Sequence, residues 1–116
     1  MALNDWSDSI VIAELGDEPA FSEDMDALIR RITNSHAQGN ADVPDVILNM
    51  QGVTYLNSSN LAQLLKLRKQ LNACQRRLRI CAVNDSVWSV MLTTGLDGVF
   101  NFTEDVSTSL ASLQIQ

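Results

Sequence analysis

An apolar run from Val46 to Met50, a turn, and then two adjacent serines constrain this chain more than any other segment. A short, continuous apolar run is typical of a strand that is buried on both faces of a sheet. Ser58 and Ser59 open a stretch of leucines at helical spacing, which places their hydroxyl groups at a helix N-terminus. Unpaired N–H groups and the helix dipole favour negative charge there. The segment therefore predicts a strand–turn–helix unit that receives a phosphate group well.

The rest of the chain continues this alternation of strand and helix patterns. Strands are predicted at residues 9–15, 45–50, 78–83 and 100–102. Helices are predicted from an N-cap at Ser22 to a polar loop at residues 37–44, and over residues 58–74, 85–95 and 104–113. Strands that alternate with helices indicate an α/β fold with one largely parallel sheet.

Two of the predicted helices have recognisable apolar faces. In the first helix, residues at i, i+3, i+4 and i+7 form the face: Met25, Leu28, Ile29 and Ile32. In the second helix, five leucines supply a broad apolar side: Leu61, Leu64, Leu65, Leu67 and Leu71. Both faces are expected to pack against the sheet.

The segment from Val46 to Phe100 resembles the STAS domain (sulphate transporter and anti-sigma factor antagonist). The usual pattern of that family is a buried strand ending in Asp, then Gly-Val-x-x-x-Asp-Ser-Ser-Gly-Leu, a helix, a strand and a later Thr-Gly-Leu. The matching residues here are Asn49, Gly52-Val53, Asn57-Ser58-Ser59-Asn60-Leu61 and Thr94-Gly95-Leu96. The resemblance implies a single STAS-like domain over residues 1–116, with a four- or five-stranded, largely parallel or mixed sheet and helices packed against it.

The resemblance also implies a regulatory function for Ser58. In STAS anti-sigma factor antagonists, the serine at this position accepts a phosphate from a partner kinase that is also the anti-sigma factor. The unphosphorylated antagonist binds that partner, and the phosphorylated one releases it. A purely structural alternative is that Asn57 or Ser58 serves as the N-cap of the helix.

Three residues depart from the family pattern: Asn49 and Asn57 replace carboxylates, and Asn60 replaces glycine. The first two changes remove two negative charges near the acceptor serine. If those charges orient the hydroxyl group or help to bind the metal–nucleotide of the kinase, phosphorylation is slow or absent here. Asn60 adds a side chain where a partner would approach the backbone.

We expect a protein partner, an anti-sigma factor or serine kinase, to dock on the turn and on the exposed side of the second helix. The predicted contact residues are Asn57, Ser58, Ser59, Asn60, Lys66, Lys69 and Trp88. Trp88 shares one side of the third helix with Leu92, and the two predict an exposed apolar patch. Burial of Trp88 under the C-terminal helix is the alternative.

Charge and composition exclude several functions. The net charge is −6, and six of the eight basic residues fall between Lys66 and Arg79, so direct nucleic-acid binding is not expected. That basic segment is either a solvated helix face or a contact for an acidic partner surface. The chain has one histidine, His36, and no phosphate-binding loop. It therefore lacks the residues typical of a catalytic site, a metal site or a cofactor site, and none of these is expected. Cys74 and Cys81 are predicted to be buried, inert thiols.

No apolar run approaches the roughly 20 residues of a membrane span, and no signal peptide is recognisable, so a cytoplasmic protein is expected. Two functions remain. The first is a regulatory binding module that resembles an anti-sigma factor antagonist and is switched at Ser58. The second is a STAS subunit that is not phosphorylated and serves as an adaptor in a larger assembly, such as a lipid-transport or stress-signalling complex.

Overall fold

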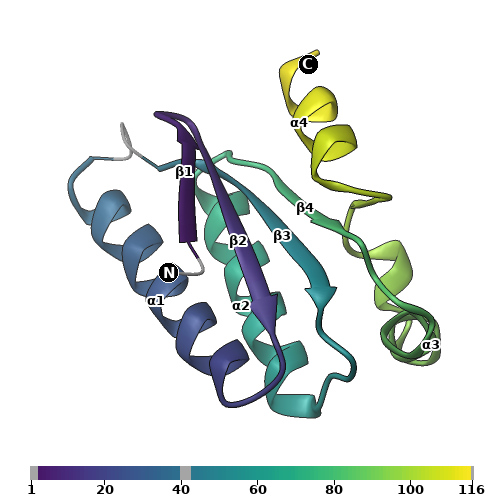
Figure 1. Ribbon diagram of the computed structural model, residues 1–116. Coiled ribbons are helices and arrows are strands. Elements are labelled where there is room, and N and C mark those ends of the chain that lie inside the picture. Colours follow the sequence, from purple (N-terminus) through teal and green to yellow (C-terminus); the bar gives the residue numbers. More distant parts are fainter. Residues whose placement is uncertain (1–2, 40–42, 116) are drawn as a thin grey trace.

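The part of the chain that the computed structural model describes, residues 3–39 and 43–115, forms five strands and four α-helices (Figure 1). The elements are β1 (Leu3–Ser7), β2 (Ile10–Gly16), α1 (Ala20–Ala37), β3 (Asp45–Gly52), α2 (Ser58–Ala73), β4 (Leu78–Cys81), α3 (Asp85–Thr94), β5 (Phe102–Thr103) and α4 (Val106–Gln114). A single 3-10 turn at Leu96–Gly98 follows α3. The predicted α/β fold with a mixed sheet is confirmed.

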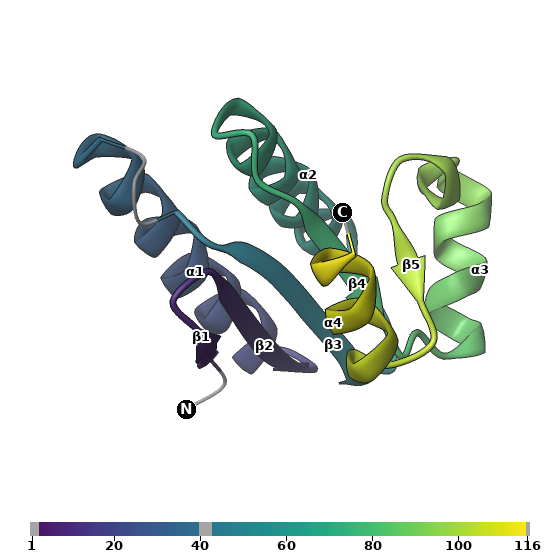
Figure 2. The same ribbon diagram turned by 90° about the horizontal axis from the view of Figure 1, so that it is seen from above.

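The strands lie in the order β1-β2-β3-β4-β5, with β1 antiparallel to β2 and every other pair parallel. Crossovers between parallel strands are almost always right-handed, so a strand order that advances in one direction keeps α1, α2 and α3 on the same face. The opposite face is covered by α4, which Figure 2 shows on the other side of β3 and β4 from α2.

The two faces of the sheet bury separate sets of side chains. The larger core lies under α1, α2 and α3 and includes the predicted apolar face of α1 and three leucines of α2, Leu64, Leu67 and Leu71. The partly buried Leu61 packs against it. The smaller core lies under α4 and consists of Ile10, Ile12, Ile47, Cys81 and Leu113. Residues of β3 alternate between the two cores, as expected for a strand buried on both faces.

The first strand was not predicted. β1 lies at the edge of the sheet and contains Asn4 and Asp5, and its residues are exposed or half-buried throughout. Such a strand shows no alternation of apolar and polar residues, so its pairing with β2 has no signature in the sequence. β5 is shorter than predicted and begins at Phe102, while Phe100 turns into the larger core.

Two helix predictions also need correction. α1 begins at Ala20 after Pro19, and Ser22 is not its N-cap; the Ser22 N–H instead donates to the Glu18 carboxylate at 2.7 Å. Leu65 of α2 was assigned to the apolar side, yet it is 40% exposed because it faces away from the sheet. Residues 40–42 of the predicted polar loop lie outside the described residues.

Candidate functional site

The turn between β3 and α2 is held by a reciprocal pair of asparagine hydrogen bonds. Asn57 is the N-cap of α2, and its Oδ1 accepts from the Asn60 N–H at 2.8 Å. The Asn60 Oδ1 accepts in turn from the Asn57 N–H at 3.0 Å. This is a capping box, in which two side chains satisfy two otherwise unpaired N–H groups. The N-cap is therefore Asn57 and not Ser58.

Asn60 has a structural place in this turn. Its side chain is 1% exposed, and its Nδ2 donates to the Glu18 carboxylate at 3.3 Å. Glu18 also binds the first turn of α1 through Ser22. Asn60 thus connects the N-termini of α1 and α2. Its buried amide supports the turn that carries the predicted contact residues and is not itself exposed to a partner.

Ser58 and Ser59 are the first two residues of α2, and both are exposed, as predicted for the turn. Within the described residues, neither serine hydroxyl makes a hydrogen bond. The first N–H groups of a helix have no partner inside the helix. A nucleophilic hydroxyl at this position is accessible, and negative charge added to it is stabilised locally by the helix dipole.

Acidic side chains at the end of β2 and in the loop after it lie at the same end of the sheet as the two serines. Glu14 is the register partner of Asn49, whose Nδ2 donates to the Glu14 carboxylate at 2.7 Å. Asp17 accepts from the Thr54 N–H at 2.8 Å and from the Thr54 hydroxyl at 2.6 Å. Sequence reasoning missed these acids. The rule that parallel strands end at one edge of a sheet would have brought them to this site.

Hydrogen bonding lowers the pKa of two carboxyl groups in this region, Asp17 and Glu18. The hydroxyl and N–H of Thr54 lower the pKa of Asp17 below its ordinary value of 3.8. The hydroxyl and N–H of Ser22 lower the pKa of Glu18 below 4.5, with a smaller contribution from Asn60. Negative charge at this end of the molecule therefore comes from β2 and the loop after it, although Asn49 and Asn57 carry none.

An exposed stripe runs along α2 from the serines. At about 100° per residue, Ser58, Leu65 and Lys69 fall within about 20° of one direction, and Lys66 lies close to the direction of Ser59. All of them are exposed. The structure thus brings the predicted residues Ser58, Ser59, Lys66 and Lys69 onto one side of the helix, with the apolar side chain of Leu65 between them.

Trp88 lies on α3. The N-terminus of α3 is close to the turn between β3 and α2. The Asn84 side chain caps α3 and its Nδ2 donates to the Val53 carbonyl at 2.7 Å. Trp88 is 36% exposed, and its ring stands edge-on to that of Phe102 with 5.1 Å between the centroids. Leu92, one turn further along, is 53% exposed. Both predicted residues are therefore exposed on α3, one helical turn apart, and Trp88 packs against Phe102 of β5.

Further properties limit the chemistry of the described residues. In the ranges 3–39 and 43–115, no three His, Cys, Asp or Glu side chains lie close enough together to hold a metal ion. No helix within these same ranges is both long enough and apolar enough to cross a bilayer. Cys81 is buried, whereas Cys74 is only half-buried, and both thiols are free.

Comparison with known proteins identifies the family of the chain. The family model of the STAS domain matches residues 8–109, and the chain belongs to this family. None of the curated proteins is significantly similar to it in sequence.

Solved structures share the fold at low sequence identity. A STAS domain protein described as an anti-sigma-factor antagonist, from Planctomyces limnophilus, is 17% identical with a TM-score of 0.74, covering 90% of this chain and 91% of its own. The anti-sigma factor antagonist SpoIIAA in its unphosphorylated form is 14% identical with a TM-score of 0.67, covering 95% and 93%. The phosphorylated Bacillus SpoIIAA is 17% identical with a TM-score of 0.68, covering 96% of each chain.

Proposed function

We propose that this protein is a regulatory binding module whose association with a protein partner is switched by phosphorylation of Ser58. The observation that carries the proposal is the exposed Ser58 hydroxyl at the first position of α2, which makes no hydrogen bond to any residue that the structure describes. Its relatives in fold include an antagonist of an anti-sigma factor that exists in unphosphorylated and phosphorylated forms. The partner proposed here is accordingly an anti-sigma factor that is also a serine kinase.

The physical basis of the switch is a conflict between local and intermolecular electrostatics. A phosphoserine carries about −1.5 to −2 charges and three acceptor oxygens. The N-terminus of α2 stabilises this charge, but a partner seated on Ser58, Leu65 and Lys69 would have to desolvate it. The modified protein keeps its fold and loses its partner.

The substitution of Asn57 for a family carboxylate favours a second candidate, a constitutive adaptor that is not phosphorylated. Asn57 satisfies the cap without charge, and the carboxylates at this end of the sheet are already bonded to Asn49, Thr54 and Ser22. In this second proposal, the same surface binds one subunit of a lipid-transport or stress-signalling assembly permanently.

Incubation with ATP and the serine kinases encoded beside the gene, followed by intact-mass measurement, separates the two candidates. We expect a single phosphate that maps to Ser58, is lost in Ser58→Ala and persists in Ser59→Ala. Ser59 is the matched control because it is adjacent and also exposed. Phosphate on Ser59, or none with any kinase, contradicts the switch.

Asn57→Asp tests the importance of the missing charge. An aspartate keeps the acceptor that caps α2, so the fold is retained. We expect faster phosphorylation of Ser58 in this variant. An unchanged rate would show that the family carboxylate has no part in the reaction at this site.

A further inference from the structure

A small cavity lies between the C-terminal parts of α1 and α2, at the end of α2 opposite to Ser58. Its volume is about 140 Å³, close to the roughly 150 Å³ that hold one benzene ring in a protein interior. Three residues of α1 and three from the end of α2 line it: Ile32, Thr33, His36, Gln70, Ala73 and Cys74. The cavity therefore has room for a group of about six heavy atoms.

A thiol and an imidazole meet at this cavity. The Sγ atom of Cys74 lies 3.3 Å from Nδ1 of His36, which is within hydrogen-bond reach for sulfur. In the tautomer that carries its hydrogen on Nε2, the imidazole accepts the thiol proton at Nδ1. A thiol beside a base is the arrangement that activates a cysteine as a nucleophile. Cys74 is half-buried and His36 is exposed, so a small molecule can reach both.

The turn after α2 fixes the position of this thiol. Cys74 is the C-cap of α2, and the two N–H groups that follow it close a Schellman motif. The Gln75 N–H donates to the Asn72 carbonyl at 3.1 Å, and Gln75 takes the left-handed φ of 58° that the motif requires. The Arg76 N–H donates to the Leu71 carbonyl at 2.8 Å. These bonds hold the backbone of the cysteine in one conformation, with its thiol beside the imidazole of α1.

The lining of the cavity includes a buried acceptor without a partner. The Oε1 atom of Gln70 is buried and accepts no hydrogen bond within the described residues. The amide nitrogen of Gln70 donates to the Thr33 hydroxyl at 2.7 Å, and that hydroxyl donates to the Ile29 carbonyl at 2.9 Å. The amide is thereby oriented, and the Thr33 proton is already used. A ligand that brings a donor would relieve the cost of the unpaired oxygen.

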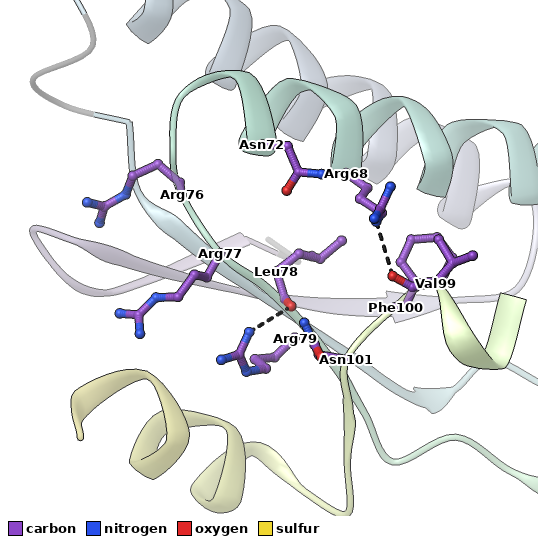
Figure 3. Close-up of a pocket in the computed structure, with 9 residues that line it drawn as sticks. All are labelled: Arg68, Asn72, Arg76, Arg77, Leu78, Arg79, Val99, Phe100 and Asn101. Atoms are coloured by element: carbon purple, nitrogen blue, oxygen red, sulfur yellow. Dashed lines mark hydrogen bonds between the residues drawn. The ribbon is translucent and has the colours of Figure 1, made fainter. Parts of the chain in front are cut away.

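The cations near this end of α2 are engaged elsewhere. Figure 3 shows Arg68 reaching from α2 towards Val99, whose carbonyl accepts from Arg68 Nε at 3.1 Å. Arg76 and Arg77 pair with Asp45. Among the described residues that line the cavity, none is a lysine, arginine, aspartate or glutamate. The cavity therefore suits an uncharged group better than an ionic one.

The second thiol of the chain is separated from this one by the sheet. Cys81 belongs to the core under α4, whereas Cys74 packs against the core under α1, α2 and α3. The two cysteines thus lie on opposite faces, and the sequence contains no other. A disulfide at Cys74 therefore takes its second sulfur from another molecule.

We propose that Cys74 is a modification site for a small, uncharged disulfide, with His36 as the base and the cavity holding the transferred half. Nδ1 of His36 takes the thiol proton while the Cys74 sulfur attacks one sulfur of the reagent. The new S–S bond forms as the old one breaks. Cys74 is oxidised, and the leaving sulfur is reduced and takes the proton from the imidazole. A hydroxyl group on the transferred half donates to Gln70 Oε1. Ser58 lies about 24 Å away along α2, so this site is separate from the proposed switch.

Exchange with three disulfides, followed by peptide mass mapping, tests the proposal. Hydroxyethyl disulfide is uncharged and brings a donor, diethyl disulfide is uncharged without a donor, and glutathione disulfide is large and acidic. Each is mixed with its own thiol, and Cys74 in the urea-unfolded chain is the reference. We expect folding to favour the hydroxyethyl adduct by about fivefold or more, the ethyl adduct by less and the glutathione adduct not at all. Equal adduct formation in the folded and unfolded chains, or a preference for glutathione, would overturn the proposal.

Substitutions separate the base from the cavity. His36→Gln should slow exchange with hydroxyethyl disulfide by about tenfold or more at pH 7, and by much less at pH 9.5, where hydroxide ionises the thiol without help. Gln70→Met removes the buried acceptor and should abolish the preference for the hydroxyethyl over the ethyl adduct. Asn34→Ala is the matched control for His36, because Asn34 is exposed on α1 and does not line the cavity.

Circular dichroism checks the fold of each variant, and His36→Asn repeats the test of the base if His36→Gln does not fold. An unchanged rate at pH 7 without the imidazole contradicts its role as the base. An equal loss in Asn34→Ala, or no adduct on Cys74 with any of the three disulfides, is evidence against the site as a whole.

Discussion

The two ends of α2 differ in how the charged side chains around them are paired. At the Ser58 end, each nearby carboxylate is bonded to a neutral amide, hydroxyl or N–H group, and the hydroxyl groups of Ser58 and Ser59 make no hydrogen bond within the described residues. At the other end, Arg76 and Arg77 share the carboxylate of Asp45, and Arg68 and Arg79 make no ion pair within the described residues. Both arrangements suit the helix dipole, which favours acids at the N-terminus and cations at the C-terminus. The difference shows that one end is organised around satisfied hydrogen bonds and the other around unbalanced charge.

Loss of the shared carboxylate should have the largest effect on stability. Asp45→Ala leaves the Arg77 N–H without its 2.7 Å acceptor and leaves two cations without a counter-charge. We expect a loss of about 3 kcal/mol in the free energy of unfolding, because breaking a buried ion pair strands its partners. Urea denaturation measures it. Asp45→Asn keeps an acceptor for the N–H group and should lose less; equal losses would contradict this account.

A methyl group at Gly52 should disturb the Ser58 end next most strongly. An alanine Cβ at this position would lie 2.9 Å from the Leu15 carbonyl oxygen of the neighbouring strand, so the backbone must move. We expect Gly52→Ala to cost about 2 kcal/mol. Its register partner, Gly16, has open space at the same point, and Gly16→Ala should be close to neutral. Thermal unfolding of the two variants checks the contrast, which fails if they unfold together.

Removal of the buried amide at the Ser58 end should have a smaller effect. Asn60→Ala leaves the N–H of Asn57 and the carboxylate of Glu18 with one partner fewer. The expected cost is about 1–2 kcal/mol by denaturant unfolding. Ser59→Ala, in the same turn, should stay within about 0.5 kcal/mol of the parent protein. A neutral Asn60→Ala would mean that the capping box does not stabilise the turn.

Lowering the pH should reduce the stability of the Ser58 end by the smallest amount of these changes. The folded-state pKa values of Asp17 and Glu18 lie below the ordinary values of 3.8 and 4.5. Their contribution is therefore complete above the unfolded pKa and is lost as the pH falls through the folded pKa. Melting temperatures between pH 6 and pH 3 should fall less steeply in Asp17→Asn than in the parent protein. Parallel curves would exclude a contribution from Asp17.

The order of elements could be predicted because apolar periodicity reports burial, and most strands and helices here bury one or two faces. β1 has no such signal, since it pairs at an exposed edge. The sequence left the N-cap of α2 open between Asn57 and Ser58, and the structure assigns it to Asn57. The inward path of Asn60 depends on Glu18, 42 positions away. The serines were found from the sequence pattern, but the pairing of Arg76 and Arg77 with Asp45 arises only because β3 and the segment before β4 lie side by side. The proposed roles of the predicted contact residues remain predictions.

The position of α4 has a kinetic consequence. It is joined to the sheet through a two-residue β5 and covers Cys81, whose thiol has a pKa raised by burial. Elements with few contacts open first, on a path well below global unfolding. A thiol reagent should therefore modify the half-buried Cys74 quickly and reach Cys81 only as often as α4 detaches. The labelling rate of Cys81 would then report how often this face of the sheet opens.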